Sequence, residues 1–393
     1  MGRYNVPEIS ADVFLVGVKD WNRKIFDALI PLPQGTSYNS YLIRGKEKTA
    51  LIDTVSPGFE GELTAKIKQM MVLTDLDYIV MNHAEPDHAG AISHILQMSD
   101  KTTLLATAKG AKMIQRYYKV PEEKIKIVKD GDTVELGGKT LRFIEAPFLH
   151  WPETMFTYLV ENKVLFPCDF FGAHTAFGLY DEDVEEIIPF AKRYFGEIMM
   201  PFRTMAIKAL EKIKELEIKI IAPSHGPIYK KPERILEAYR KWTSGETREK
   251  AIVLYISMLG STETMIKAMV ETLFSEDIEV SLYNLLGADI GEIAKDFVDS
   301  RAIVLGMLTM LGGMHPLAGY ATYLIKAFRP PLKYGVILSS HGFGGGAVQQ
   351  AREIFGHMQI EVIGTLDVDG LPTDDDCQNI AEIGKQLSHK MKG

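Results

Sequence analysis

The stretch His83-Ala-Glu85-Pro-Asp87-His88 directly follows the apolar segment Asp77–Met81. A strand is expected in that segment, so the stretch should form the loop at the end of the strand, where side chains can converge. Four of its six residues carry metal-binding side chains, because imidazoles stand at both ends and carboxylates between them. Imidazole and hard oxygen donors together suit a first-row transition metal. The stretch therefore predicts a metal centre at the end of a buried strand.

Three more potential ligands, His150, Asp169 and His225, each follow a predicted strand. Taken singly, such a His or Asp is more commonly a capping or turn residue. His94, on a predicted amphipathic helix, is interpreted as structural. Seven such residues at strand ends are hard to explain separately, and we expect them to line one rim of the sheets. The predicted metal-binding residues are His83, Glu85, Asp87, His88, His150, Asp169 and His225.

The organisation of the chain changes near residue 248. Before it, many short strand-like runs are interrupted by Gly, Asp and Pro and joined by few helices, such as Glu60–Val72 and Ala108–Tyr118. This pattern predicts two packed sheets with helices outside. After it, five strand-like runs alternate with helical stretches, which predicts a flavodoxin-like, doubly wound parallel sheet. The predicted domains are 1–248 and 249–393, and the five runs are Ile252–Ser257, Ile278–Leu282, Ala302–Gly306, Gly335–Ser339 and Glu361–Thr365.

The amino-acid composition indicates which binding partners and which cellular compartment to expect. A net charge of −8 argues against nucleic acid or an anionic membrane surface as the main partner. No segment reaches the ~18 consecutive apolar residues of a membrane span. Two cysteines, Cys168 and Cys377, cannot supply a disulfide framework or a rubredoxin-type centre within the chain. We therefore expect a cytoplasmic protein.

A second group of residues predicts a site for a phosphate and a flat ring after residue 249. Ser257–Thr264 joins the first strand of this part to a helix, and the backbone N–H groups of such a turn can hold a phosphate. The same residue types also serve as ordinary helix caps. Two later stretches are rich in glycine, which permits close approach of the backbone to a ring, although an α/β module without a ligand also has glycine turns. The predicted cofactor-binding residues are Ser257, Met258, Leu259, Gly260, Ser261, Thr262, Met307, Leu308, Thr309, Met310, Leu311, Gly312, Gly313, Ser340, His341, Gly342, Phe343, Gly344 and Gly345.

These motifs resemble a known family. The run H-x-E-x-D-H, followed by His, Asp and His at these separations, resembles the metallo-β-lactamase fold in its flavodiiron version, and Ser257-x-x-Gly260-x-Thr262 is similar to the FMN phosphate loop of flavodoxins. Zinc hydrolases of the first fold carry H-x-H-x-D-H, whereas Glu85 supplies a harder, anionic ligand that favours iron. The resemblance covers nearly the whole chain. It implies an N-terminal αββα sandwich followed by a flavodoxin-like five-stranded sheet.

The resemblance also implies an activity. A flavodiiron oxidoreductase reduces dioxygen to water, nitric oxide to nitrous oxide, or both, with two irons and FMN. By resemblance, one iron is bound by His83, Glu85 and His150, the other by Asp87, His88 and His225, and Asp169 bridges them. Further implications are a head-to-tail homodimer or dimer of dimers and an external electron donor such as rubredoxin. His174, five residues beyond Asp169, is a candidate catalytic residue, with a surface loop histidine as the alternative.

The chain departs from the family pattern at three places. Leu308 and Leu311 stand where Pro and Asn are usual, Phe343 stands in place of a Trp, and Asp27 stands where relatives often have a pocket His. Two other functions stay open at this point: a zinc hydrolase with a fused flavodoxin-like domain, and an electron-carrier or binding module without chemistry in its first domain. Glu85 argues against the first, and the full set of seven residues argues against the second.

Overall fold

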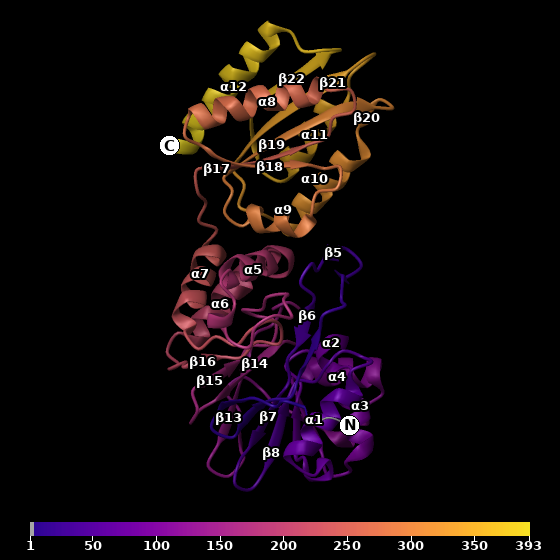
Figure 1. Cartoon of the computed structure of the whole chain (residues 1–393), viewed down its shortest axis with the longest axis vertical. Coiled ribbons are helices and arrows are strands. Elements are labelled where there is room, and N and C mark those ends of the chain that lie inside the picture. The colour runs from indigo at the N-terminus through magenta and orange to yellow at the C-terminus, as the bar shows by residue number, and fades with distance from the viewer. Residues whose placement is uncertain (1–3) are drawn as a thin grey trace. The chain divides into compact units, whose positions relative to one another are not determined.

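The computed structural model describes residues 4–393 and separates into two compact units (Figure 1). The first runs to Phe195 and also contains Phe202–Thr243, and the second consists of Gly196–Pro201 and Ser244–Gly393. We describe each unit separately and keep 1–248 and 249–393 as the proposed division into domains. Residues 1–3 of the first proposed domain lie outside the described residues. Among residues 4–393, no helix is long and apolar enough to span a membrane.

A seven-stranded sheet forms one layer of the first unit, in the order β1-β2-β7-β8-β9-β10-β11. Strands β8 to β11 run parallel, whereas β1, β2, β7 and β8 pair antiparallel. The parallel part matters for the site because the carboxyl ends of its strands lie at one edge. The strands are β1 (Glu8–Ser10), β2 (Val13–Leu15), β7 (Tyr41–Arg44), β8 (Thr49–Ile52), β9 (Tyr78–Val80), β10 (Thr103–Ala106) and β11 (Ile125–Ile127).

The side chains of this sheet alternate between two cores, as the period of two along a strand requires. In β8, Leu51 joins a core with the helices α1 (Glu60–Met70), α3 (Ile92–Met98) and α4 (Ala108–Tyr118). Its neighbours Ala50 and Ile52 face a second core, shared with the other sheet. One face of the sheet is therefore covered by helices and the other by a second sheet.

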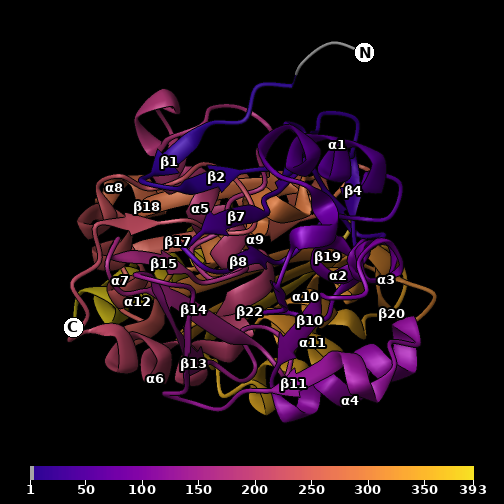
Figure 2. The same cartoon turned by 90° about the horizontal axis from the view of Figure 1, so that it is seen from below.

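The second sheet of this unit has five strands in the order β12-β13-β14-β15-β16. They are β12 (Thr133–Glu135), β13 (Thr140–Glu145), β14 (Met155–Leu159), β15 (Val164–Phe166) and β16 (Ile220–Ile221). Figure 2 shows α1, α3 and α4 on one side of the strands, and α6 (Arg203–Ile213) and α7 (Pro232–Ser244) on the other. Helix α5 (Ile187–Tyr194) precedes α6. The unit is an αββα sandwich, which confirms the predicted fold of the first domain.

Two short hairpins complete the strand pairing of this unit. β3 (Val18–Asp20) pairs with β6 (Thr36–Tyr38), and β4 (Ile25–Phe26) pairs with β5 (Ile30–Pro31). Asp27 and Ala28 form the turn of the second hairpin, both with positive φ, and Leu29 N donates to Phe26 O at 3.0 Å.

The second unit holds the predicted five-stranded parallel sheet, in the order β18-β17-β19-β21-β22. The strands are β17 (Lys250–Tyr255), β18 (Glu279–Asn284), β19 (Ala302–Met310), β21 (Tyr334–His341) and β22 (Glu361–Asp369). Figure 1 shows α8 (Ser261–Ser275) and α12 (Asp374–Lys392) together on one face, and α9 (Ile290–Phe297) and α10 (Pro316–Phe328) on the other. Helix α11 (Ala347–His357) joins β21 to β22. The order is flavodoxin-like, as predicted.

One prediction in this unit was too short. The strand predicted to end at Gly306 continues to Met310, and its end pairs antiparallel with β20 (Gly313–Met314). The stretch from Met307 to Gly313 is thus a strand and a tight hairpin, with Leu311 and Gly312 at its turn in positive φ.

Candidate metal centre and cofactor cavity

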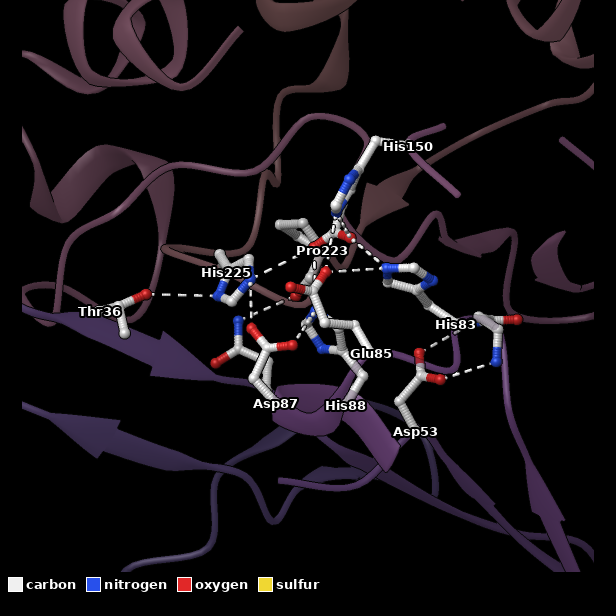
Figure 3. Close-up of polar contacts among 12 residues, drawn as sticks. Thr36, Asp53, His83, Glu85, Asp87, His88, His150, Pro223 and His225 are labelled. Carbon is white, nitrogen blue, oxygen red and sulfur yellow. Dashed lines mark hydrogen bonds and ion pairs between the residues drawn. The ribbon is translucent and has the colours of Figure 1, made fainter. Parts of the chain in front are cut away.

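The seven predicted metal-binding residues converge at the strand ends of the first unit, and Figure 3 shows six of them pointing toward one another. His83 and Glu85 follow β9, whereas Asp87 and His88 lie on the four-residue helix α2 (Pro86–Ala89) rather than in a loop. Pro86 occupies the first position of this helix, where its missing N–H has no consequence. The other three follow β13, β15 and β16: His150, Asp169 and His225.

The ligand atoms form two groups, and the Asp169 carboxylate lies between them. His83, Glu85, His150 and Asp169 offer one atom each within 4.8 Å of one another, and so do Asp87, His88 and His225. Asp169 Oδ2 lies 3.5 Å from His83 Nε2 and 3.4 Å from His150 Nε2. Its Oδ1 lies 3.0 Å from His88 Nε2 and 3.3 Å from His225 Nε2. The two oxygens of one carboxylate therefore face two different groups.

These atoms fit a metal better than they fit one another. Both carboxylate oxygens of Asp87 and of Asp169, and both ring nitrogens of His88, are buried and have no hydrogen bond of ordinary geometry among residues 4–393. Buried polar atoms are normally hydrogen-bonded, since leaving them unpaired is unfavourable. The carboxylate oxygens and histidine nitrogens lie 3.0–3.5 Å apart but do not have hydrogen-bond geometry. Each group of ligand atoms instead surrounds a shared central point. A cation at each point satisfies them.

The pKa shifts within the cluster also fit a bound cation. Burial by itself lowers the pKa of His150, but contacts with Asp169 and Glu85 outweigh burial and raise that pKa to about 9. Likewise burial lowers the pKa of His225, and Asp169 and Asp87 raise it to about 10. Burial raises the pKa of Glu85, yet the contacts with His150 and His83 hold it well below its usual range. In the metal-free chain these pKa shifts favour positive charge on the histidines, as expected for a site that surrounds a cation with carboxylates.

Two partners outside the cluster orient its histidines. His83 Nδ1 lies 2.7 Å from Oε1 of Glu153, and His225 Nδ1 donates to the carbonyl oxygen of Ser37 at 2.7 Å. Both contacts leave Nε2 facing the ligand groups, as in metal sites where the outer ring nitrogen is held by a carboxylate or carbonyl. The sequence prediction missed both partners. Glu153 stands only three residues after His150, which was the one available signal.

His174 is buried beside the metal-binding group, so the alternative of a surface loop histidine is wrong. Its ring centroid lies 4.9 Å from that of His225 and 4.8 Å from that of Tyr194, and its Nδ1 lies 3.0 Å from Thr36 Oγ1. Burial, and then the charge of His225, hold the pKa of His174 well below its usual range. The ring is therefore neutral. A catalytic role for it stays a prediction.

Asp27 lies close to the metal-binding residues, whereas His94 does not belong to them. Asp27 is at the turn between β4 and β5, where partial burial and then the Glu85 charge raise its pKa and His150 opposes them. It therefore lies within electrostatic reach of the metal-binding residues. His94 is exposed on α3 and belongs to neither ligand group, in agreement with a structural role.

A cavity of about 400 Å³ lies at the carboxyl ends of the strands of the second unit. It brings together most of the predicted cofactor-binding residues and adds Gly370. The predicted residues outside its lining are Gly260, Met307, Gly312, Gly313, Gly344 and Gly345. The lining consists of Ser257, Met258, Leu259, Ser261, Thr262, Leu308, Thr309, Met310, Leu311, Ser340, His341, Gly342, Phe343 and Gly370.

The polar end of this cavity is held together by two hydroxyl groups. Ser257 Oγ accepts from the backbone N–H groups of Gly260 and Glu263 at the start of α8, at 3.2 and 3.3 Å. Thr262 Oγ1 donates to Met307 O and lies 3.1 Å from Ser340 Oγ. The start of α8 is thereby fixed against two other strand ends. A helix N-terminus built in this way can accept a phosphate.

The chain is similar to known proteins over nearly its whole length. The family model described as "ODP family beta lactamase" matches residues 36–226. The crystal structure of the flavodiiron protein from Giardia intestinalis superposes with a TM-score of 0.95 at 27% identity, covering 100% of this chain and 98% of that one. The nitric oxide reductase of Moorella thermoacetica is 37% identical over 392 residues, which are 98% of each chain. The chain belongs to the flavodiiron protein family.

Another solved structure, the rubredoxin oxygen:oxidoreductase of Desulfovibrio gigas, superposes with a TM-score of 0.96 at 27% identity, and the match covers 99% of each chain. The predicted family and fold are confirmed, and as a flavodiiron protein the chain is an oxidoreductase. The roles of individual metal-binding and FMN-binding residues stay predictions.

Proposed function

We propose that this flavodiiron protein uses two irons and one FMN to reduce dioxygen to water, nitric oxide to nitrous oxide, or both. The observation that carries the proposal is the position of Asp169, whose two oxygens face two groups of ligands at 3.0–3.5 Å. In this assignment Asp169 would contribute one oxygen to each iron position. The first iron would be held by His83, Glu85 and His150, and the second by Asp87, His88 and His225.

Iron suits these ligands better than zinc does. Glu85, Asp87 and Asp169 supply three negative charges and hard oxygen atoms, and the imidazoles complete the set. Bound there, a diferrous pair holds two electrons and reduced FMN two more, which together match the four that dioxygen needs and exceed the two that a pair of nitric oxide molecules needs. The buried position keeps solvent from the reacting gas.

His174 is the proposed catalytic residue among the side chains that bind no iron. Because Nδ1 of His225 already donates to Ser37 O, the Thr36 hydroxyl is placed to donate to Nδ1 of His174. The proton of the neutral His174 ring is then on Nε2, which is buried and lacks a hydrogen-bond partner within the described part of the chain. This N–H is available to a ligand at the metal centre, either as a hydrogen-bond donor or as a proton source.

The cavity of the second unit is the proposed FMN site. Ser257, Ser261 and Thr262, at the start of α8, hold the phosphate. Leu311 and Phe343 are 99% and 96% exposed at the cavity, so both are free to cover the flat ring. Phe343 takes the place of the usual Trp and keeps an aromatic face for stacking.

We further propose an external donor and a homodimer. The D. gigas relative is named for rubredoxin, and the two cysteines of this chain, both free, cannot form a rubredoxin centre. Free cysteines also fit a reducing cytoplasm. Met258 and Leu259, 67% and 81% exposed beside Leu311 and Phe343, form an apolar surface of a kind that marks interfaces. A head-to-tail dimer, or a dimer of such dimers, covers it and brings the FMN of one chain near the irons of the other.

The test of this function is cofactor content together with gas turnover. Elemental analysis and flavin absorbance of the purified chain should give about two irons and one FMN per chain. Assays with reduced rubredoxin should then show consumption of nitric oxide under anaerobic conditions, reduction of dioxygen to water, or both. Two zinc ions, or metal without flavin, would instead support a hydrolase of the metallo-β-lactamase fold.

A further inference from the structure

The two proposed iron positions differ in what lies behind their histidines. The outer nitrogen of His83 faces the Glu153 carboxylate at 2.7 Å, whereas that of His225 faces the neutral carbonyl of Ser37 at 2.7 Å. The outer nitrogen of His88, Nδ1, has no hydrogen bond among residues 4–393. Among these three histidines, only His83 has a carboxylate hydrogen-bonded to its outer nitrogen within residues 4–393.

Glu153 is buried and firmly placed. Its side chain is 1% exposed, and the same oxygen, Oε1, accepts from both His83 and the backbone N–H of Ala84, the latter at 2.9 Å. The backbone carbonyl of Glu153 accepts from Thr107 Oγ1 at 2.9 Å, and Thr107 in turn caps α4 by accepting from Gly110 N. The ring of Trp151 stands edge-on to His83, with centroids 5.0 Å apart. The loop that carries Glu153 is therefore anchored on three sides.

The charge of Glu153 is directed at His83. Its ion pair in the described structure is with His83 Nδ1, and its other oxygen, Oε2, has no hydrogen bond there. A carboxylate on the outer nitrogen makes the imidazole a stronger donor and fixes its orientation, and loss of such a partner typically lowers metal affinity by about 10- to 100-fold. The carboxylates in direct contact with the ligand histidines are also unequal between the two positions. Within 3.5 Å of these histidines, Glu85 and Glu153 serve the first position, Asp87 serves the second, and Asp169 is shared. The buried Asp53 interacts electrostatically with His88 and His83, so it does not distinguish the two positions.

We propose that Glu153 is a positioning residue that makes the His83–Glu85–His150 position the tighter iron site, which fills first and releases its iron last. This inference rests on the proposed diiron centre. It concerns an inequality between the two positions, which the proposed function does not require.

The substitution Glu153→Gln separates charge from geometry. Because Oε1 accepts both hydrogen bonds, the amide oxygen of a glutamine can accept both, so the substitution removes the charge and places an NH2 group at the Oε2 position, which has no hydrogen bond among residues 4–393. The matched control is Thr36→Val, which removes a neutral hydroxyl 3.3 Å from His225 Nδ1 behind the other position. Valine has nearly the same shape as threonine, and the substitution changes no charge.

The experiment loads the full chain with ⁵⁷Fe²⁺ without oxygen and dialyses it against increasing concentrations of chelator, with iron per chain and Mössbauer spectra as readouts. The wild type should lose its first iron at a chelator concentration about 10- to 100-fold lower than its second, with a plateau at one iron. Glu153→Gln should remove most of this separation and give mixed spectra at one iron per chain, whereas Thr36→Val should keep the plateau.

Two further variants locate the tight iron without altering Glu153. His225→Ala should retain one tightly held iron, and His83→Ala should retain only a weakly held one. Simultaneous loss of both irons from the wild type, or a plateau that survives Glu153→Gln, overturns the inference while leaving the diiron function intact. A wild-type chain that never takes up two irons overturns both.

Discussion

The hydroxyl oxygen of Thr36 lies 3.0 Å from Nδ1 of His174, although the two residues are 138 positions apart in the chain. Thr36 belongs to β6, and the same strand offers its Ser37 carbonyl to His225. One short strand thus holds both a proposed iron ligand and the neutral histidine beside it. The strand contacts only the Nδ1 atoms of the two rings, so Nε2 of His225 can face the carboxylates of Asp87 and Asp169.

Replacing His174 by leucine should lower kcat for gas reduction by about 100-fold, because the available N–H is lost from the metal centre. Iron and FMN content should stay at the wild-type level, since His174 is not one of the proposed ligands. The measurement is steady-state turnover with nitric oxide and with dioxygen at fixed donor concentration. Thr36→Val should lower kcat less, by about 10-fold, because the ring remains but its orientation is less fixed. Full turnover in His174→Leu would remove this residue from the catalytic set.

The stability of the metal-free chain should fall as pH rises from about 6.5 to about 10. The sign follows from His150 and His225, whose pKa values in the folded chain are raised to about 9 and about 10, above the ~6.5 of an unfolded histidine. Between these values the folded chain binds more protons than the unfolded one, so their stabilising contribution is complete below pH ~6.5 and lost as pH passes through the folded pKa values. Denaturant unfolding of chelator-treated chain at several pH values measures the effect.

Iron-loaded chain provides the control for this dependence. The histidine nitrogens lose their protons when they bind metal, so the loaded chain should show little change of stability over the same pH range and metal affinity should rise with pH. An unfolding free energy of the metal-free chain that is constant from pH 6 to 10 would contradict the assigned charge states.

The position of the ligands at strand ends explains which parts of the metal centre could be predicted from the sequence. His83, His150 and His225 each follow a strand, which their local surroundings report. They come from two different sheets, and the local sequence does not show that the ends of those sheets meet. The partners behind these histidines could not be predicted. Ser37 and Thr36 reach His225 from a strand almost two hundred residues earlier, and no local pattern reports such a pairing. Whether His174 is buried or lies in a surface loop was left open for the same reason.

The cofactor cavity shows a different limit. Residues of both glycine-rich stretches line the cavity, but a chain segment does not say which of its residues face it. Met307 was grouped with the ring-binding loop, yet it lies inside β19, where it is fully buried and its carbonyl accepts from Thr262. Pleating directs alternate side chains to opposite faces of a sheet, so an error in the end of a strand becomes an error in its lining residues.

Phe343→Ala should weaken FMN binding by about 10-fold, because stacking of a flat ring on an aromatic side chain contributes about 1–3 kcal/mol. Phe343→Trp should bind FMN at least as tightly as the wild type, since the larger ring offers more stacking area. Fluorescence titration of the FMN-free chain measures both. Phe274→Ala is the control, because Phe274 is 58% exposed on α8 and does not line the cavity. Equal dissociation constants for Phe343→Ala and the wild type would show that Phe343 does not cover the ring.

Asp169→Asn should abolish gas reduction while leaving FMN bound. The substitution replaces one carboxylate oxygen by an NH2 group, which donates rather than accepts and cannot bind metal. Since Oδ1 and Oδ2 face different histidine pairs, one of the two irons loses a ligand whichever way the amide turns. Iron content should fall from two toward one per chain, and turnover should fall by at least about 1000-fold.

Asp53→Asn is the control for this variant. It removes a buried carboxylate near the metal centre without removing the proposed bridging residue, Asp169. Asp53 is 1% exposed and accepts from Asn82 N and Nδ2 at 2.7 and 3.1 Å, but it belongs to neither ligand group. This variant should be less stable by about 1–3 kcal/mol, because an amide cannot accept at both positions, and should still bind two irons. FMN absorbance should match the wild type in both variants, since the cavity consists of residues from Ser257 to Gly370. Retained turnover in Asp169→Asn would sink the assignment of Asp169 as the bridge, whereas iron loss in both variants would attribute the effect to general disruption of the first unit.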